Sequence, residues 1–172
     1  DKNLLASGSG DGTIYIWNLL DNDSFQLTGE TDSKYGDTCV YSLAFHPKGK
    51  IIASGLKDGT IRLWNIETRK EEKLLEGEHQ EIIRSINFNM KGDLIVSGSK
   101  DKKTIVWNWK EKKSIPEKSF EFKSEVHCVA FHSRNIIVSA LGNGEVRCGD
   151  KPFIKLDPGT KIRSIAFNED RT

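Results

Sequence analysis

The sequence is poor in the features that would place it in several common protein classes. It has only 3 cysteines, Cys39, Cys128 and Cys148, and no C-x-x-C pair, so neither a disulfide framework nor a cysteine-ligated metal is predicted. Unpaired thiols indicate a reducing compartment, and we expect an intracellular protein, cytoplasmic, with a nuclear location left open. No apolar run approaches the length of a transmembrane helix.

An excess of charge of one sign is also lacking. Lys and Arg number 26 against 25 Asp and Glu, a net charge of +1, so the charge of the whole molecule predicts neither nucleic-acid nor membrane binding. The sequence has no G-x-S-x-G, no H-E-x-x-H and no phosphate-binding glycine loop before a helix. The 4 histidines do not have metal-ligand spacing. We therefore expect no enzyme activity, no cofactor and no metal.

What the sequence does have is a repeated hairpin. Its clearest copy is Ile52–Ile66, IASGLKDGTIRLWNI, in which two apolar runs flank an Asp-Gly pair, the strongest short-range signal for a tight β-hairpin. Similar sequences occur at Leu5–Leu19 and Ile95–Trp109, and a degenerate copy occurs at Ile137–Asp150. The sequence therefore predicts four hairpins.

The hairpins recur at a regular spacing together with a second motif. Trp17, Trp64 and Trp107 are 47 and 43 residues apart, and Gly149 lies 42 residues further on, where a fourth Trp would fall. The second motif has a Ser or Cys followed three residues later by Phe, and its copies are Ser42–Gly49, Ser85–Gly92, Cys128–Ser133 and Ser164–Asn168. Four-stranded units of about 40–45 residues are typical of propeller blades, which pack on one another because one unit cannot bury its own faces.

These motifs resemble the WD-repeat β-propeller family over essentially the whole chain, although the usual Trp-Asp ending reads Trp-Asn three times. The resemblance implies an all-β fold, a β-propeller of four-stranded antiparallel blades, with four blades' worth of strands in one domain, 1–172. The polar stretch Glu30–Asp37 is predicted to be a surface loop. The expected divisions are three strands of an incomplete blade at 1–29, complete blades at 38–76, 81–122 and 125–156, and a lone innermost strand at 161–168.

The closure of the ring has three alternatives at this point. Open strand edges are costly, and propellers protect theirs by closing. The chain is a piece of a longer propeller, or it self-associates as a homodimer in which each copy supplies half of an eight-bladed ring, or its own ends close a four-bladed ring.

One group of residues has the composition of a Ser-His-Asp hydrolase site. It comprises His79, Ser97, Asp101 and Trp107. The resemblance implies instead the structural tetrad of the family, in which these side chains form hydrogen bonds within one blade; Ser99 could take the place of Ser97. Only this blade has all four residue types.

The resemblance also implies a partner-binding face, the axial mouth, where innermost strands begin and where the residue before each turn Asp projects. Of twelve such positions, five are Lys or Arg and one is Glu. The candidate partner-binding residues, which we call the basic mouth, are Tyr41, Lys57, Arg84, Lys100, Glu125, His127, Lys161 and Arg163.

The functional hypothesis is a non-catalytic scaffold or sensor module that binds a protein or peptide partner, with an acidic partner as one option for the basic mouth. The alternative is binding of nucleic acid or a phosphorylated ligand at the same place, which the neutral net charge and the single aromatic residue, Tyr41, disfavour. A third interpretation is that the charges are solvated and hold no ligand.

Overall fold

The computed structural model describes residues 3–27, 38–111, 116–132 and 135–168. The segment Glu30–Asp37, predicted to be a surface loop, lies outside the described residues. All regular elements of the described chain are β-strands, arranged in four antiparallel sheets. No helix long and apolar enough to cross a membrane occurs in this part of the chain.

The first sheet has three strands and the other three sheets have four each, and within each sheet the strands are neighbours in chain order. The first sheet is β1 (Leu4–Gly8), β2 (Ile14–Asn18) and β3 (Ser24–Leu27). The second is β4 (Val40–Phe45), β5 (Ile51–Leu56), β6 (Ile61–Asn65) and β7 (Lys70–Leu75). The third is β8 (Ile83–Phe88), β9 (Leu94–Ser99), β10 (Lys103–Asn108) and β11 (Pro116–Glu121). The fourth is β12 (Val126–Phe131), β13 (Ile137–Leu141), β14 (Glu145–Cys148) and β15 (Lys151–Lys155).

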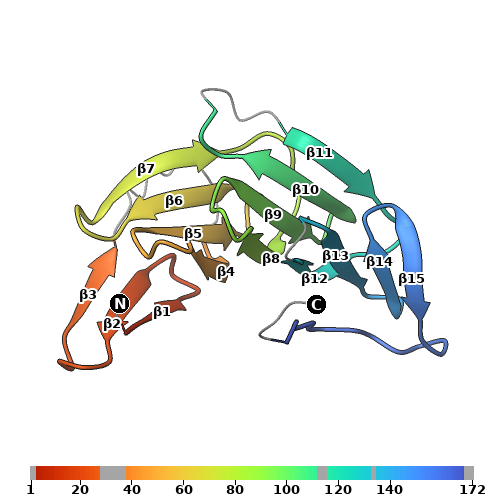
Figure 1. Ribbon diagram of the computed structural model, residues 1–172, viewed down its shortest axis with the longest axis horizontal. Coiled ribbons are helices and arrows are strands. Elements are labelled where there is room, and N and C mark those ends of the chain that lie inside the picture. The colour runs from red at the N-terminus through yellow and green to blue at the C-terminus, as the bar shows by residue number, and fades with distance from the viewer. Residues whose placement is uncertain (1–2, 28–37, 112–115, 133–134, 169–172) are drawn as a thin grey trace.

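The four sheets follow one another along an arc, with β4, β8 and β12 on its inner side (Figure 1). Three apolar clusters fill the spaces between successive sheets, and Trp64, Trp107 and Phe131 each lie in a different one. The all-β fold of antiparallel four-stranded blades that the sequence predicts is confirmed.

The Asp-Gly hairpin turns are only partly as predicted: Gly12 and Gly59 have a positive φ, but Asp11 and Asp58 do not, so these are not two-residue turns with both residues at positive φ. In the second sheet the Oδ1 atom of Asp58 accepts hydrogen bonds from the backbone N and the hydroxyl of Thr60, at 2.9 and 2.7 Å. Gly59 has a φ of +85°, which a residue without a Cβ adopts at little cost. The turn is therefore fixed by the sequence of three consecutive residues.

The sheets approach one another closely at one recurring glycine. A Cβ on Gly98 in β9 would lie 2.6 Å from Val126 and 2.7 Å from Val129 of β12, and a Cβ on Gly55 in β5 would lie 2.6 Å from Ile83 of β8. The corresponding residue of the fourth sheet is Ala140, which is fully buried. Glycine at the earlier positions lets the next innermost strand lie against the sheet.

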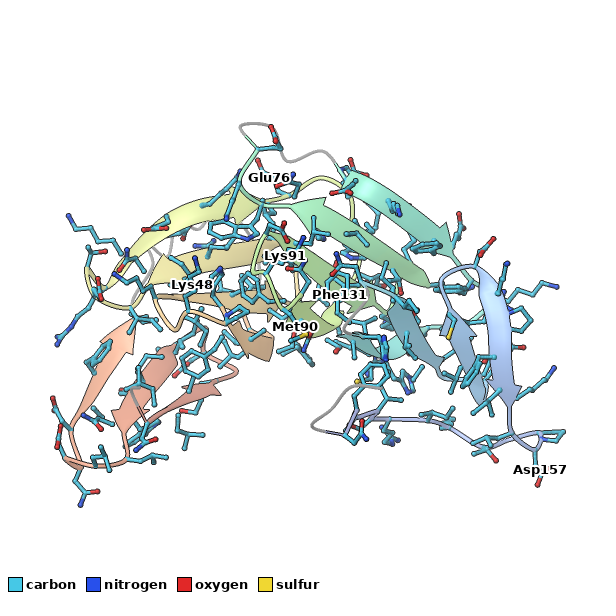
Figure 2. The ribbon with its side chains drawn as sticks, in the orientation of Figure 1. Lys48, Glu76, Met90, Lys91, Phe131 and Asp157 are labelled. Carbon is cyan, nitrogen blue, oxygen red and sulfur yellow. The ribbon has the colours of Figure 1, made fainter. Side chains whose placement is uncertain are left out.

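A histidine forms a second contact between blades. His46, in the turn after β4, accepts a hydrogen bond from the backbone N of Lys48 at Nδ1 (3.0 Å), so its Nε2 carries the proton and donates to the carbonyl of Gly92 (3.0 Å). Its ring also meets the ring of Phe88 edge-on. Lys48 and Lys91, labelled in Figure 2, lie on the turns of the second and third sheets that make this contact.

The segment 161–168 differs from the prediction. It packs against β12, where the carbonyl of Ile162 accepts a hydrogen bond from Nδ1 of His127 (2.9 Å) and the rings of Phe167 and His132 meet edge-on. It is not a strand, however, because a ladder needs a partner, and β1, which lacks an innermost partner, lies at the other end of the arc (Figure 1). The described residues therefore do not show the four-bladed closure by the chain's own ends.

The outer faces of the first and fourth sheets expose apolar side chains. Leu5 and Trp17 are 52% and 41% exposed on the first sheet, and Phe153 is 68% exposed on the fourth. In the second sheet the equivalent residues, Ile52 and Trp64, are buried between the first and second sheets.

Replacing Gly98 by Ala tests the close approach. The new methyl group would overlap Val126 and Val129, and we expect the free energy of unfolding to fall by about 1–3 kcal/mol, the usual cost of overpacking. Gly10→Ala is the matched control, because its Cβ would meet only the sulfur of Cys39 at 3.8 Å. Urea denaturation of both variants measures the difference, and equal losses would contradict the proposed packing.

The contact of His46 predicts a pH dependence of stability. Burial is the largest cause that lowers the pKa of His46 below the ordinary 6.5. The hydrogen bond to Gly92 raises the pKa, and the nearby charges of Lys110 and Lys48 lower it further. Because the unfolded chain then takes up the proton first, this contribution is complete above pH 6.5 and is lost as the pH falls below it. His46→Asn should lose less stability than the parent chain between pH 7.5 and 5.5 in urea titrations, whereas parallel pH profiles would refute the role of His46.

Candidate functional site

The four tetrad residues form one continuous chain of hydrogen bonds in the third sheet. The indole N–H of Trp107 donates to the Ser97 hydroxyl at 2.8 Å, which is 2.7 Å from Nε2 of His79. Nδ1 of His79 then lies 2.8 Å from Oδ2 of Asp101. Because the carboxylate can only accept, His79 donates to Asp101 at Nδ1. Ser99 has a different role, accepting from the backbone N of Asp101 and donating to the carbonyl of Glu81.

Burial distinguishes this group from a hydrolytic triad. Ser97 is fully buried and His79 is 4% exposed, and the Ser97 oxygen already accepts the indole proton of Trp107. Burial raises the pKa of Asp101, but the hydrogen bond from His79, its charge and the backbone N–H groups of Lys103 and Gln80 outweigh burial, so the net pKa is lowered. The carboxylate therefore stays ionised at neutral pH, while no substrate can reach the serine.

The other sheets keep only part of this network. In the second sheet the indole N–H of Trp64 donates to Ser54 at 3.0 Å, but the buried Oδ2 of Asp58 has no hydrogen-bond partner in the described part of the chain. In the fourth sheet Gly149 replaces the tryptophan, and the buried Ser139 hydroxyl pairs instead with Thr104 of the third sheet at 2.9 Å. The polar network is therefore strongest in the third sheet.

The basic mouth contains a small cavity of about 150 Å³, lined by Tyr41, Arg84, His127 and Arg163. These residues come from four successive repeats and occupy the same position in each, directly before Ser42, Ser85, Cys128 and Ser164. The three innermost strands and the segment 161–168 therefore bring four residues distant in sequence to one place.

A β-bulge in each innermost strand contributes to this convergence. The pairing with the second strand shifts between Val40 and Ser42, between Ile83 and Ser85, and between Val126 and Cys128. The extra residues at the three bulges are Tyr41, Arg84 and His127. A bulge redirects the side chain of its extra residue, and all three of these side chains line the cavity.

The remaining candidates of the basic mouth do not line the cavity. Glu125 is next to it, with Oε2 2.8 Å from Nη2 of Arg84 and 3.6 Å from Nε2 of His127. Lys100 is paired with Glu81 at 3.5 Å, both partly exposed. Lys57 and Lys161 are exposed and lie outside the cavity lining.

Sequence reasoning missed the two ion pairs and the bulges. Glu81 precedes an innermost strand and was not among the candidates, although a Glu directly before a strand start next to a pre-turn Lys is a usable signal. The bulges have no signal in the residues themselves. Within the described residues, no three His, Cys, Asp or Glu side chains are grouped so that they could hold a metal ion.

The two turn aspartates offer a matched test of the tetrad. In Asp101→Asn the amide would lose the charged bond to His79, and we expect a loss of about 1.5–3 kcal/mol of unfolding free energy. Asp58→Asn should cost under about 0.5 kcal/mol, since Oδ1 keeps the turn and Oδ2 has no described partner to lose. Urea titration of both variants measures the difference; similar losses would show that the tetrad adds no stability.

The comparisons with known proteins agree with this geometry. The family model described as WD domain, G-beta repeat, matches residues 1–18, 26–65 and 70–108, more than half of the chain. The search of curated proteins finds no match. The fourth sheet, β12–β15, lies beyond the matched residues and has the same strand order. The chain belongs to the WD-repeat family.

Proposed function

We propose that this protein is a non-catalytic interaction module that holds an acidic segment of a protein partner at the cavity of its basic mouth. WD repeats generally mediate protein–protein interaction, which supports the general part of the proposal. The observation that carries the specific part is the convergence of Arg84 and Arg163 on one cavity. Guanidinium groups bind carboxylates through paired hydrogen bonds.

The size of the cavity favours a single side chain as its ligand. A volume of about 150 Å³ is smaller than the roughly 300–1,000 Å³ typical of sites for whole small molecules. A carboxylate at the end of a Glu or Asp side chain needs only a small space. The rest of a partner would then lie across the surrounding turns.

The donors around the cavity match an acceptor ligand. Nε of Arg84 is buried and has no hydrogen-bond partner among the described residues, and Tyr41 is 46% exposed. Tyr41 can therefore donate to an incoming oxygen without giving up an existing bond, whereas the buried Nε of Arg84 would first have to become accessible. The lining comprises Tyr41, Arg84, His127 and Arg163 and includes no Ser, Thr or Cys.

The alternative ligand is nucleic acid or a phosphorylated molecule, because phosphate oxygens accept from the same guanidinium groups. The near-neutral chain and the single aromatic residue in the cavity other than His127 favour the peptide. A nucleic acid bound through its phosphates would show an affinity that falls steeply with salt.

Fluorescence anisotropy with a fluorescein-labelled octaglutamate peptide tests the proposal. We expect binding to the parent chain and at least tenfold weaker binding to the double variant Arg84→Gln with Arg163→Gln, because each glutamine keeps polarity but removes the charge. Lys70→Gln with Lys118→Gln, on the exposed outer strands β7 and β11, is the charge-matched control and should bind like the parent.

Three results would contradict the proposal. The first is no binding of the peptide to the parent chain, and the second is equal weakening by the control variant. The third is tighter binding of a labelled oligothymidylate than of the peptide with a steep salt dependence, which would favour the alternative ligand.

A further inference from the structure

The carboxylate of Glu125 lies where a ligand of the mouth cavity would bind. Its Oε2 atom is 2.8 Å from Nη2 of Arg84 and 3.6 Å from Nε2 of His127, two of the four lining residues. A carboxylate is also the group proposed above as the ligand. The cavity therefore has an acidic side chain of its own at its margin.

The bond to Arg84 is the main contact that holds this carboxylate. His127 uses its Nδ1 proton on the carbonyl of Ile162, at 2.9 Å, so the neutral ring has no proton at Nε2 to offer to Glu125. Arg163 is exposed and forms no ion pair among the described residues. The carboxylate thus uses one of two guanidinium groups and leaves the other open.

The ion pair is easily exchanged. The side chains of Arg84 and Glu125 are 31% and 36% exposed, and pairs in such positions contribute at most about 1 kcal/mol. The backbone of Glu125 is fixed separately, because its carbonyl accepts a hydrogen bond from Gly142 at 2.9 Å. The side chain can therefore leave Arg84 without disturbing the start of β12.

We propose that Glu125 is an internal competitor for the acidic ligand, and that it sets the affinity and the charge selectivity of the mouth cavity. This inference rests on the proposed function. With Glu125 on Arg84, an incoming carboxylate first meets Arg163 and gains Arg84 only by displacing Glu125. Ligands with several carboxylates are then favoured over a single carboxylate.

A double-mutant cycle on Glu125 and Arg84 tests the inference, with the labelled octaglutamate peptide as the probe. Glu125→Gln should tighten binding roughly threefold or more, because the competitor loses its charge. In the Arg84→Gln background the same change should have a much smaller effect, since there is no guanidinium left to compete for. Glu117→Gln, on the exposed part of β11, removes the same charge away from the mouth and should leave affinity unchanged.

The outcomes separate this inference from the proposed function. If the peptide binds the parent and needs Arg84 and Arg163, but Glu125→Gln changes nothing, the competitor role is wrong and the proposed function stands. An equal gain in both backgrounds would mean that Glu125 acts only as a distant charge, which also overturns the inference. Absence of binding to the parent and to Glu125→Gln would overturn both.

Discussion

The packing of each innermost strand against the next is the contact on which the rest of the structure depends. A single blade leaves both faces uncovered, so its apolar residues are buried only by its neighbours. The contact is close because glycine stands at Gly55 and Gly98, where a Cβ would overlap the next strand. Since β4, β8 and β12 pack side by side, the equivalent positions of successive repeats, such as Arg84 and His127, line one cavity. The same packing therefore stabilises the fold and assembles the site.

The parts predictable from the sequence are those encoded by neighbouring residues. The Asp58-Gly59 turn is set by three residues, and the recurrence of such turns gave the number and strand order of the sheets. The four cavity residues were predictable because a fixed period places equivalent residues at equivalent positions. Ser97 and Ser99 could not be separated, since residues two apart on a strand share a face. The segment 161–168 was predicted as a strand but is not one in the structure, because a strand also requires a pairing partner, which the residues of the segment do not specify.

The unequal tetrads show how a repeat fold distributes polar contacts. The third sheet connects Trp107 to Asp101 through His79, whereas the second keeps an aspartate whose Oδ2 has no described partner. Both aspartates hold their turn through the other oxygen. The turn function and the network function of one residue type are thus separable, and only the turn function is common to both sheets. This explains how blades can lose the histidine without losing the hairpin.

The near-neutral charge of the chain and the basic mouth are compatible because the relevant charge is local. Two guanidinium groups converge on the cavity lining, and one of them is offset by Glu125. Both ends of that pair are about one-third exposed, so water screens it and the pair adds little to stability. For the acidic ligand that we propose, its larger effect is on selectivity, because that ligand must replace a carboxylate already present before it gains Arg84. A site with both guanidinium groups free would attract every anion. A site with an internal carboxylate binds only anions whose interaction with the guanidinium is stronger than that of the internal carboxylate.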